Sequence, residues 1–108
     1  MSRAGTVLFN DLRAGQIIED DRGYHFRYDE DYLNNPLAQP VSLTLPLRTE
    51  EFTGKTMIPF FDGLIPEGWL LDIAQKNWKL DPKDRMGLLL ACCKDCIGAV
   101  SVQPEPGA

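Results

Sequence analysis

Residues 60–69 constrain the fold of this chain more than any other stretch, because two glycines, a proline and three large aromatics fall within it. Gly63 can adopt the positive φ that ends a helix. Pro66 has a fixed φ and no N–H group, which suits the first turn of a new helix, and Glu67 adds a negative charge to that turn. The stretch predicts a helix, a tight apolar connection and a second helix. An ordinary turn and a docking corner both fit this local pattern.

Three short helices are predicted around this corner. Thr56 can cap the first, over residues 57–62, the second covers 66–79, and the third begins at Asp81 with Pro82 in its first turn. Four residues of the third helix have core-facing spacing: Met86, Leu89, Leu90 and Cys93.

Short strands are predicted over residues 6–9, 15–19 and 24–28, which are rich in β-branched and aromatic residues and are separated by turn residues. Short turns between consecutive strands predict an antiparallel meander. The last of these strands alternates aromatic and polar side chains, so His25 is expected on the solvated face.

Prolines and polar residues divide the middle of the chain. Asp29 is a candidate cap for a helical turn over 30–34. In residues 41–47 the apolar side chains fall at every second position, which predicts a strand with one buried face, and Pro46 confines that strand to an edge. Residues 48–55 predict an exposed loop, and residues 97–102 predict a last strand.

Together these elements predict an α+β fold, a small antiparallel sheet packed against about three short helices. The sheet would consist of the meander plus an edge strand and a C-terminal strand. The length of 108 residues fits one domain, over 1–103, with a polar tail over 104–108. Met1 and the Pro-Gly ending favour a complete small protein over a fragment.

Charge and hydropathy exclude several classes of function. The formal net charge is −5 and the lysines and arginines are scattered, which argues against nucleic-acid binding. The N-terminus lacks an apolar signal-peptide core, and no apolar run approaches the length of a membrane span. We therefore expect a cytoplasmic protein.

Four motifs follow one another along the chain: F-N-D-L-R-A-G at 9–15, P-V-S-L-T-L-P-L at 40–47, F-F-D-G-L-I-P-E-G-W at 60–69 and D-C-I-G-A-V at 95–100. In this order they resemble the N-terminal subdomain of HipA-type Ser/Thr kinase toxins. One departure is Cys93-Lys94 before Asp95, where the family often has Gly-Arg. A HipA-type kinase continues for roughly three hundred further residues, and the motifs here cover nearly the whole chain.

This resemblance implies a protein-binding regulator. A free-standing copy of the subdomain is similar to the small antitoxin of three-gene HipB–HipS–HipT systems. The implied partner is a HipT-type Ser/Thr kinase, in a larger complex with a HipB-type DNA-binding protein. The alternative is a structural subdomain or fold-completing subunit without an inhibitory role.

The corner supplies the predicted contact residues, with Trp69 as the anchor. Trp69 falls outside the core-facing arc of its helix, whereas Trp78 falls inside it. In the alternative packing, Trp69 folds back onto Ile65 or Ile73. The predicted partner-binding residues are Phe61, Asp62, Gly63, Leu64, Ile65, Glu67, Gly68 and Trp69.

Catalytic motifs are absent from the sequence. It has no Gly-rich phosphate loop, no H-R-D-x-x-x-x-N and no D-F-G. Asp62-Gly63 is not part of a D-F-G motif, because the residues around it do not continue that pattern. We therefore expect no enzymatic activity, no catalytic residues and no cofactor.

The three cysteines, Cys92, Cys93 and Cys96, cluster in one place. An odd number in one cluster is not a disulfide framework. A zinc site needs four ligands, and His25 lies far away in the sequence. A small redox or metal protein is the weaker alternative, and we expect no metal.

Overall fold

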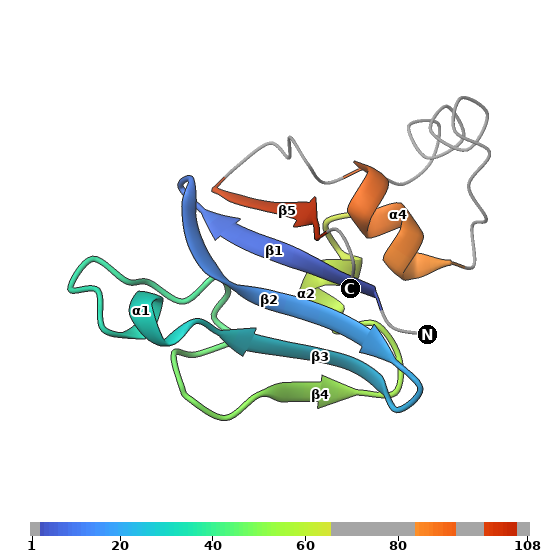
Figure 1. Cartoon of the computed structure of the whole chain (residues 1–108), viewed down its shortest axis with the longest axis horizontal. Coiled ribbons are helices and arrows are strands. Elements are labelled where there is room, and N and C mark those ends of the chain that lie inside the picture. The colour runs from blue at the N-terminus through green and yellow to red at the C-terminus, as the bar shows by residue number, and fades with distance from the viewer. Residues whose placement is uncertain (1–2, 66–83, 93–98, 106–108) are drawn as a thin grey trace.

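The computed structural model describes residues 3–65, 84–92 and 99–105, which form a five-stranded antiparallel sheet with short helices packed on it (Figure 1). The strand order is β4-β3-β2-β1-β5. The predicted α+β class is therefore confirmed. The strands are β1 (Arg3–Phe9), β2 (Leu12–Asp20), β3 (Gly23–Tyr28), β4 (Phe52–Gly54) and β5 (Val100–Pro104). The helices are α1 (Glu30–Leu33), α2 (Pro59–Asp62) and α4 (Arg85–Cys92).

A tight hairpin joins β1 to β2 at the predicted turn. Asn10 and Asp11 both have positive φ, 50° and 68°, a combination typical of a two-residue hairpin turn. The pairing register shifts beyond Val7, a bulge that leaves Ala14 fully buried. At Gly15 an added Cβ would lie 2.2 Å from the carbonyl oxygen of Arg27, so this pairing requires glycine.

The alternation in β3 places aromatic side chains on the core face, as predicted. Phe26 and Tyr28 are buried, and Tyr24 is half-buried. The prediction of a solvated His25 is wrong, because its side chain is only 13% exposed. Pairing of β3 with β4 brings a second chain segment beside this histidine.

Residues 41–47 do not form the predicted strand. Val41 and Leu45 are buried, but Leu43 is 99% exposed, because a turn closes between Ser42 and Leu45. Within the turn, the backbone N–H of Thr44 donates to the Ser42 hydroxyl at 3.2 Å. The Tyr28 hydroxyl accepts a hydrogen bond from the Val41 N–H and donates one to the Leu45 carbonyl. It thus satisfies two backbone groups that a strand would have paired with its neighbour.

The edge of the sheet beside β3 is occupied by β4 instead. The prediction of an exposed loop over 48–55 is therefore wrong for Phe52–Gly54. Phe52 stacks on Phe26 at a centroid distance of 6.1 Å, and the guanidinium of Arg48 lies 3.7 Å from the Phe52 ring centre. These contacts favour pairing at this edge over a solvated loop.

The helix expected over 57–62 is shorter than predicted. Its first helical residue is Pro59, and Ile58 has an extended backbone with φ −57° and ψ 127°. A residue before proline is disfavoured in the α region, so the helix cannot include Ile58, and Thr56 is not its cap. Met57 and Ile58 are buried in the core instead.

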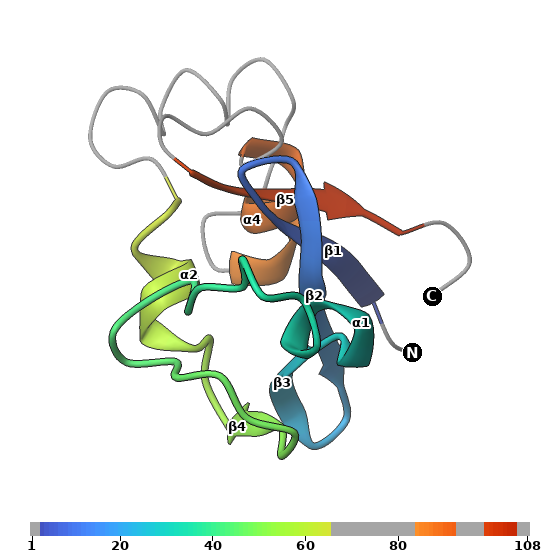
Figure 2. The ribbon, with the colours of Figure 1, turned by 90° about the vertical axis from the view of Figure 1, so that its left-hand side faces the viewer.

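Helices α2 and α4 lie on one face of the sheet (Figure 2). In α4 the predicted core residues Met86 and Leu89 are fully buried, together with Leu88. The first turn is capped by Asp84, whose carboxylate accepts a hydrogen bond from the N–H of Gly87 at 3.1 Å. Asp81, the expected cap, lies outside the described residues.

The predicted tail begins with two ordered residues. Pro104 is the last residue of β5 and pairs with Gly5, and the N–H of Glu105 donates to the Ala4 carbonyl at 3.0 Å. The Glu105 carboxylate accepts from the Thr6 hydroxyl at 2.6 Å and from the Gln16 amide at 2.5 Å. The hydrogen bond from Thr6, followed by that from Gln16, lowers the pKa of Glu105.

Among the helices of residues 3–65, 84–92 and 99–105, none is long and apolar enough to cross a membrane.

Candidate partner-binding corner

Two of the predicted partner-binding residues are core residues. Phe61 is fully buried. The centroid of its ring lies 5.1 Å from the ring centroid of Phe26 and 5.2 Å from that of Phe60. Ile65 is also buried. Their side chains are not displayed on the surface, so their contribution to the corner is to fix its backbone against the sheet.

Asp62 connects the two helices that meet at this corner. Its Oδ1 atom lies 2.6 Å from the Nε of Arg85 in α4, with the two side chains 43% and 30% exposed. A pair at this exposure keeps part of its hydration, so its effect on stability is modest. Arg85 could not be predicted from the sequence pattern, because its separation of 23 residues from Asp62 leaves no local signal.

Gly63 does not adopt the positive φ predicted from its position. Its φ is −68° and its ψ −15°, an ordinary right-handed conformation. An added Cβ would meet the Phe60 carbonyl oxygen at 3.4 Å, an ordinary contact. Neither the backbone nor the packing of the described residues therefore requires glycine at this exposed position.

The backbone after Gly63 continues as a tight turn. The N–H of Leu64 donates to the Phe61 carbonyl at 3.1 Å, and the N–H of Ile65 donates to the Asp62 carbonyl at 3.2 Å. The backbone of residues 64 and 65 is thus hydrogen-bonded to α2. Leu64 is half-buried, whereas Phe61 and Ile65 on either side of it in the turn are buried.

The remaining predicted contact residues, Glu67, Gly68 and Trp69, lie outside the described residues. The same holds for Trp78, Cys93 and Cys96, and for the helix predicted over 66–79.

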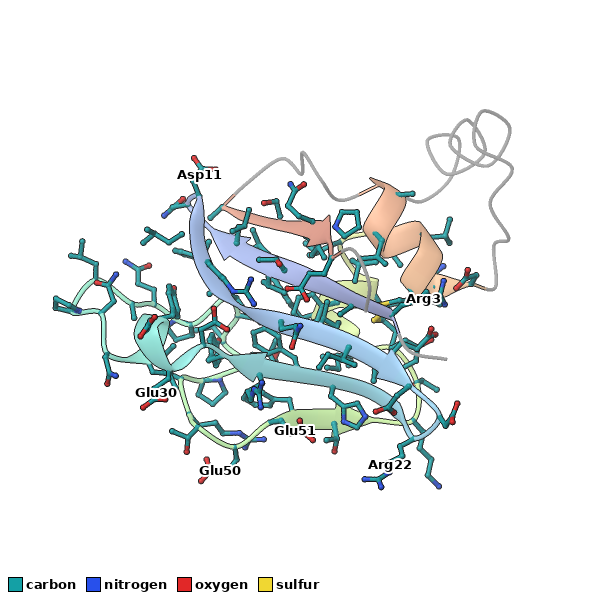
Figure 3. All side chains as sticks on the ribbon, viewed as in Figure 1. Arg3, Asp11, Arg22, Glu30, Glu50 and Glu51 are labelled. Carbon is teal, nitrogen blue, oxygen red and sulfur yellow. The ribbon has the colours of Figure 1, made fainter. Side chains whose placement is uncertain are left out.

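A second ionic cluster attaches α4 to the sheet near the N-terminus (Figure 3). The guanidinium of Arg3 in β1 donates to both oxygens of Asp84, at 2.9 and 2.6 Å, and to Glu19 in β2 at 2.8 Å. The hydrogen bond from Arg3 is the main cause of the lowered pKa of Asp84. This cluster and the Asp62–Arg85 pair fix the start of α4 from two sides.

One polar cluster of the described residues surrounds His25. His25 has Asp20 3.0 Å from its Nε2 atom and Glu51 3.4 Å from its Nδ1 atom, so carboxylates flank both ring nitrogens. Across residues 3–65, 84–92 and 99–105, no group of three or more His, Cys, Asp or Glu side chains is placed to hold a metal ion.

Comparison with known proteins gives the family. Residues 5–103 match the HipA N-terminal domain. A solved structure described as the N-terminal domain of HipA toxin superposes with a TM-score of 0.75 at 31% sequence identity, covering 98% of this chain and 95% of that one. The fold is thus that of a HipA N-terminal subdomain. The chain belongs to the HipA N-terminal domain family.

Two relatives show the domain in two settings. An uncharacterized protein of Haemophilus influenzae is 36% identical over 103 residues, which are 95% of this chain and 93% of that protein. The putative kinase Y4mE of Sinorhizobium fredii is 33% identical over 93 residues, which are 85% of this chain but only 22% of that protein. The chain therefore spans about a fifth of this kinase relative and nearly all of the other.

Proposed function

We propose that this chain is an antitoxin that binds and neutralises a HipT-type Ser/Thr kinase, with the corner at residues 61–69 docked near the kinase active site. In this proposal the chain acts by binding and catalyses no reaction. A HipB-type DNA-binding protein is the third component that the family resemblance implies.

The observation that carries this proposal is the double occurrence of the domain. It makes up nearly the whole of one relative and about a fifth of a putative kinase. A domain found both attached to a kinase-like chain and alone is suited to bind such a chain in trans. The ionic contact of Asp62 and the aromatic contacts of Phe61 hold the first part of the corner, residues 61–65, in place, which lowers the entropy cost of docking for those residues.

A second function is consistent with the same occurrence. The chain would complete the fold of a kinase that lacks this domain and leave its activity intact or raise it. The match to part of Y4mE favours this alternative, because there the domain belongs to the kinase-like chain itself.

Co-expression with a HipT-type kinase that lacks this domain separates the two functions. A neutralising antitoxin restores growth and abolishes phosphorylation by the purified complex. A fold-completing subunit increases soluble kinase and leaves growth inhibited. If the kinase and the chain do not co-purify at all, both proposals are wrong.

A further inference from the structure

An uncharged groove lies on the surface between the β1–β2 hairpin and the segment after α1. It has a volume of about 450 Å³ and is bordered by Asn10 and Gln39. Its apolar lining is Phe9, Leu12, Pro36, Leu37 and Ala38. Single exposed leucines are common on protein surfaces, but here Leu12, 43% exposed, and Leu37, 75% exposed, border the same groove. Two other lining residues, Phe9 and Ala38, are partly buried and pack against the core.

Both walls of this groove are held in place by hydrogen bonds. The N–H of Asn10 at the hairpin tip donates to the Ala99 carbonyl at 2.8 Å. On the other wall, the Asn35 side chain accepts from the N–H of Leu37 at 2.8 Å, and the Tyr32 hydroxyl bonds the N–H and the carbonyl of Gln39, at 3.1 and 2.6 Å. Leu37 therefore stays exposed on a fixed loop instead of folding back onto the core.

The charge of the groove differs from that of the chain around it. The chain has a net charge of −5, yet none of the seven lining residues is charged. Asp11 stands at the outer end of the hairpin (Figure 3) and is not part of the lining. A surface of this kind selects an apolar side chain over a basic one.

We propose that this groove receives an apolar segment of the catalytic part of a HipA-type kinase supplied as a separate chain, as a second contact beside the 61–69 corner. The inference rests on the proposed function. The choice of this partner is based on Y4mE, in which the matching domain makes up only 22% of the chain. The rest of that kinase-like chain is available to cover such a surface. When the domain and the kinase are separate chains, no covalent link raises the local concentration of one near the other. A preorganised second contact then adds affinity that the link would otherwise make unnecessary.

The test compares two leucines with the same substitution. Leu37→Asp places a carboxylate in the groove, whereas Leu43→Asp places the same charge on a side chain that is 99% exposed and outside the lining. Each variant of the whole chain is titrated against a purified HipT-type kinase that has no N-terminal domain of its own. Both melting temperatures should equal that of the wild type, because neither side chain is buried.

We expect Leu37→Asp to raise the Kd for the kinase at least about tenfold and Leu43→Asp to change it less than about threefold. Equal Kd values for the wild type and Leu37→Asp overturn the groove contact while leaving the proposed function intact. No binding by the wild type overturns both. If the chain alone dimerises and Leu37→Asp makes it monomeric, the occupant is a second copy and the inference is wrong.

Discussion

The Nε atom of Arg85 lies 2.6 Å from Oδ1 of Asp62, and this pair joins α4 to the end of α2 across 23 residues of sequence. Asp62 belongs to the F-F-D-G-L-I-P-E-G-W motif, whereas Arg85 belongs to a helix whose other side is bound to β1 through Asp84 and Arg3. The end of α2 is thereby linked to the sheet through the start of α4.

Separating this pair should affect binding more than stability. A double-mutant cycle with Asp62→Asn and Arg85→Gln is expected to give a coupling energy of about 0.5–1 kcal/mol for unfolding, because both side chains are partly solvated. Urea unfolding measures this energy, and titration with the kinase gives the matching cycle for affinity. A larger coupling in unfolding than in binding would show that the pair is purely structural.

Trp69 should behave as an anchor and Trp78 as a core residue. Trp69→Ala is expected to leave the melting temperature within a degree or so and to weaken kinase binding by about 2 kcal/mol or more. Trp78→Ala should lower the melting temperature by about 4–8 °C for each kcal/mol of lost stability. Calorimetry and binding assays on both variants test this contrast. Unfolding of the Trp69→Ala protein, or its binding as tightly as the wild type, would refute the anchor role.

The same added methyl group should destabilise the fold at Gly15 and have little effect at Gly63. Gly15→Ala forces a Cβ to within 2.2 Å of a backbone oxygen and should reduce the free energy of unfolding by about 1–3 kcal/mol. Gly63→Ala meets only ordinary contacts at φ −68° and should change it by no more than about 0.5 kcal/mol. Chemical denaturation of both proteins checks the pair. A similar loss in both would mean that Gly63 has a packing constraint within the fold.

The Tyr28 hydroxyl should be a stability determinant of the 41–45 turn. Tyr28→Phe removes the partner of the buried Val41 N–H and Leu45 carbonyl, which should cost about 1–3 kcal/mol. Tyr24→Phe is the matched control at a half-buried position of the same strand. Hydrogen exchange at the Val41 amide, together with denaturation, measures the effect. Unchanged protection at Val41 would contradict the assignment.

Acid should destabilise the fold through Asp84 and Glu105. Both pKa values are lowered in the folded chain from their ordinary 3.8 and 4.5, so the unfolded state binds more protons at acidic pH. Their contribution is complete above about pH 5 and is lost as the pH falls through about 4 and below. Melting temperatures between pH 3 and 7 should therefore decline less steeply for Asp84→Asn and Glu105→Gln than for the wild type. A parallel decline would exclude these carboxylates as the cause.

Local patterns were sufficient for much of the sheet. Asn10 and Asp11 supply the backbone conformation of the hairpin, and the alternation around Phe26 selects the buried face of β3. The core stripe of α4 was also predictable, since Met86 and Leu89 follow helical spacing. These features depend on residues within a few positions of one another, which is the range over which a sequence pattern carries information.

The residues of the corner were identified from the sequence, but which of their side chains are buried was not predicted. Phe61 and Ile65 were expected among the contact residues, and the structure buries both. Apolar residues in a tight connection predict a packed site without telling which side chains face the core. That choice depends on the position of Phe26, which lies in β3 and packs on Phe61.

The sequence by itself determined the hairpin turns, the alternating face of β3 and the helical stripe of α4, because each is an interaction between chain neighbours. Only the tertiary structure decided that residues 41–47 form a turn while Phe52–Gly54 forms the strand. The free edge of β3 can pair with one segment, and the Tyr28 hydroxyl bonds the backbone of the other. The burial of His25 and the pairing of Asp62 with Arg85 have the same origin, since both require segments distant in sequence to meet.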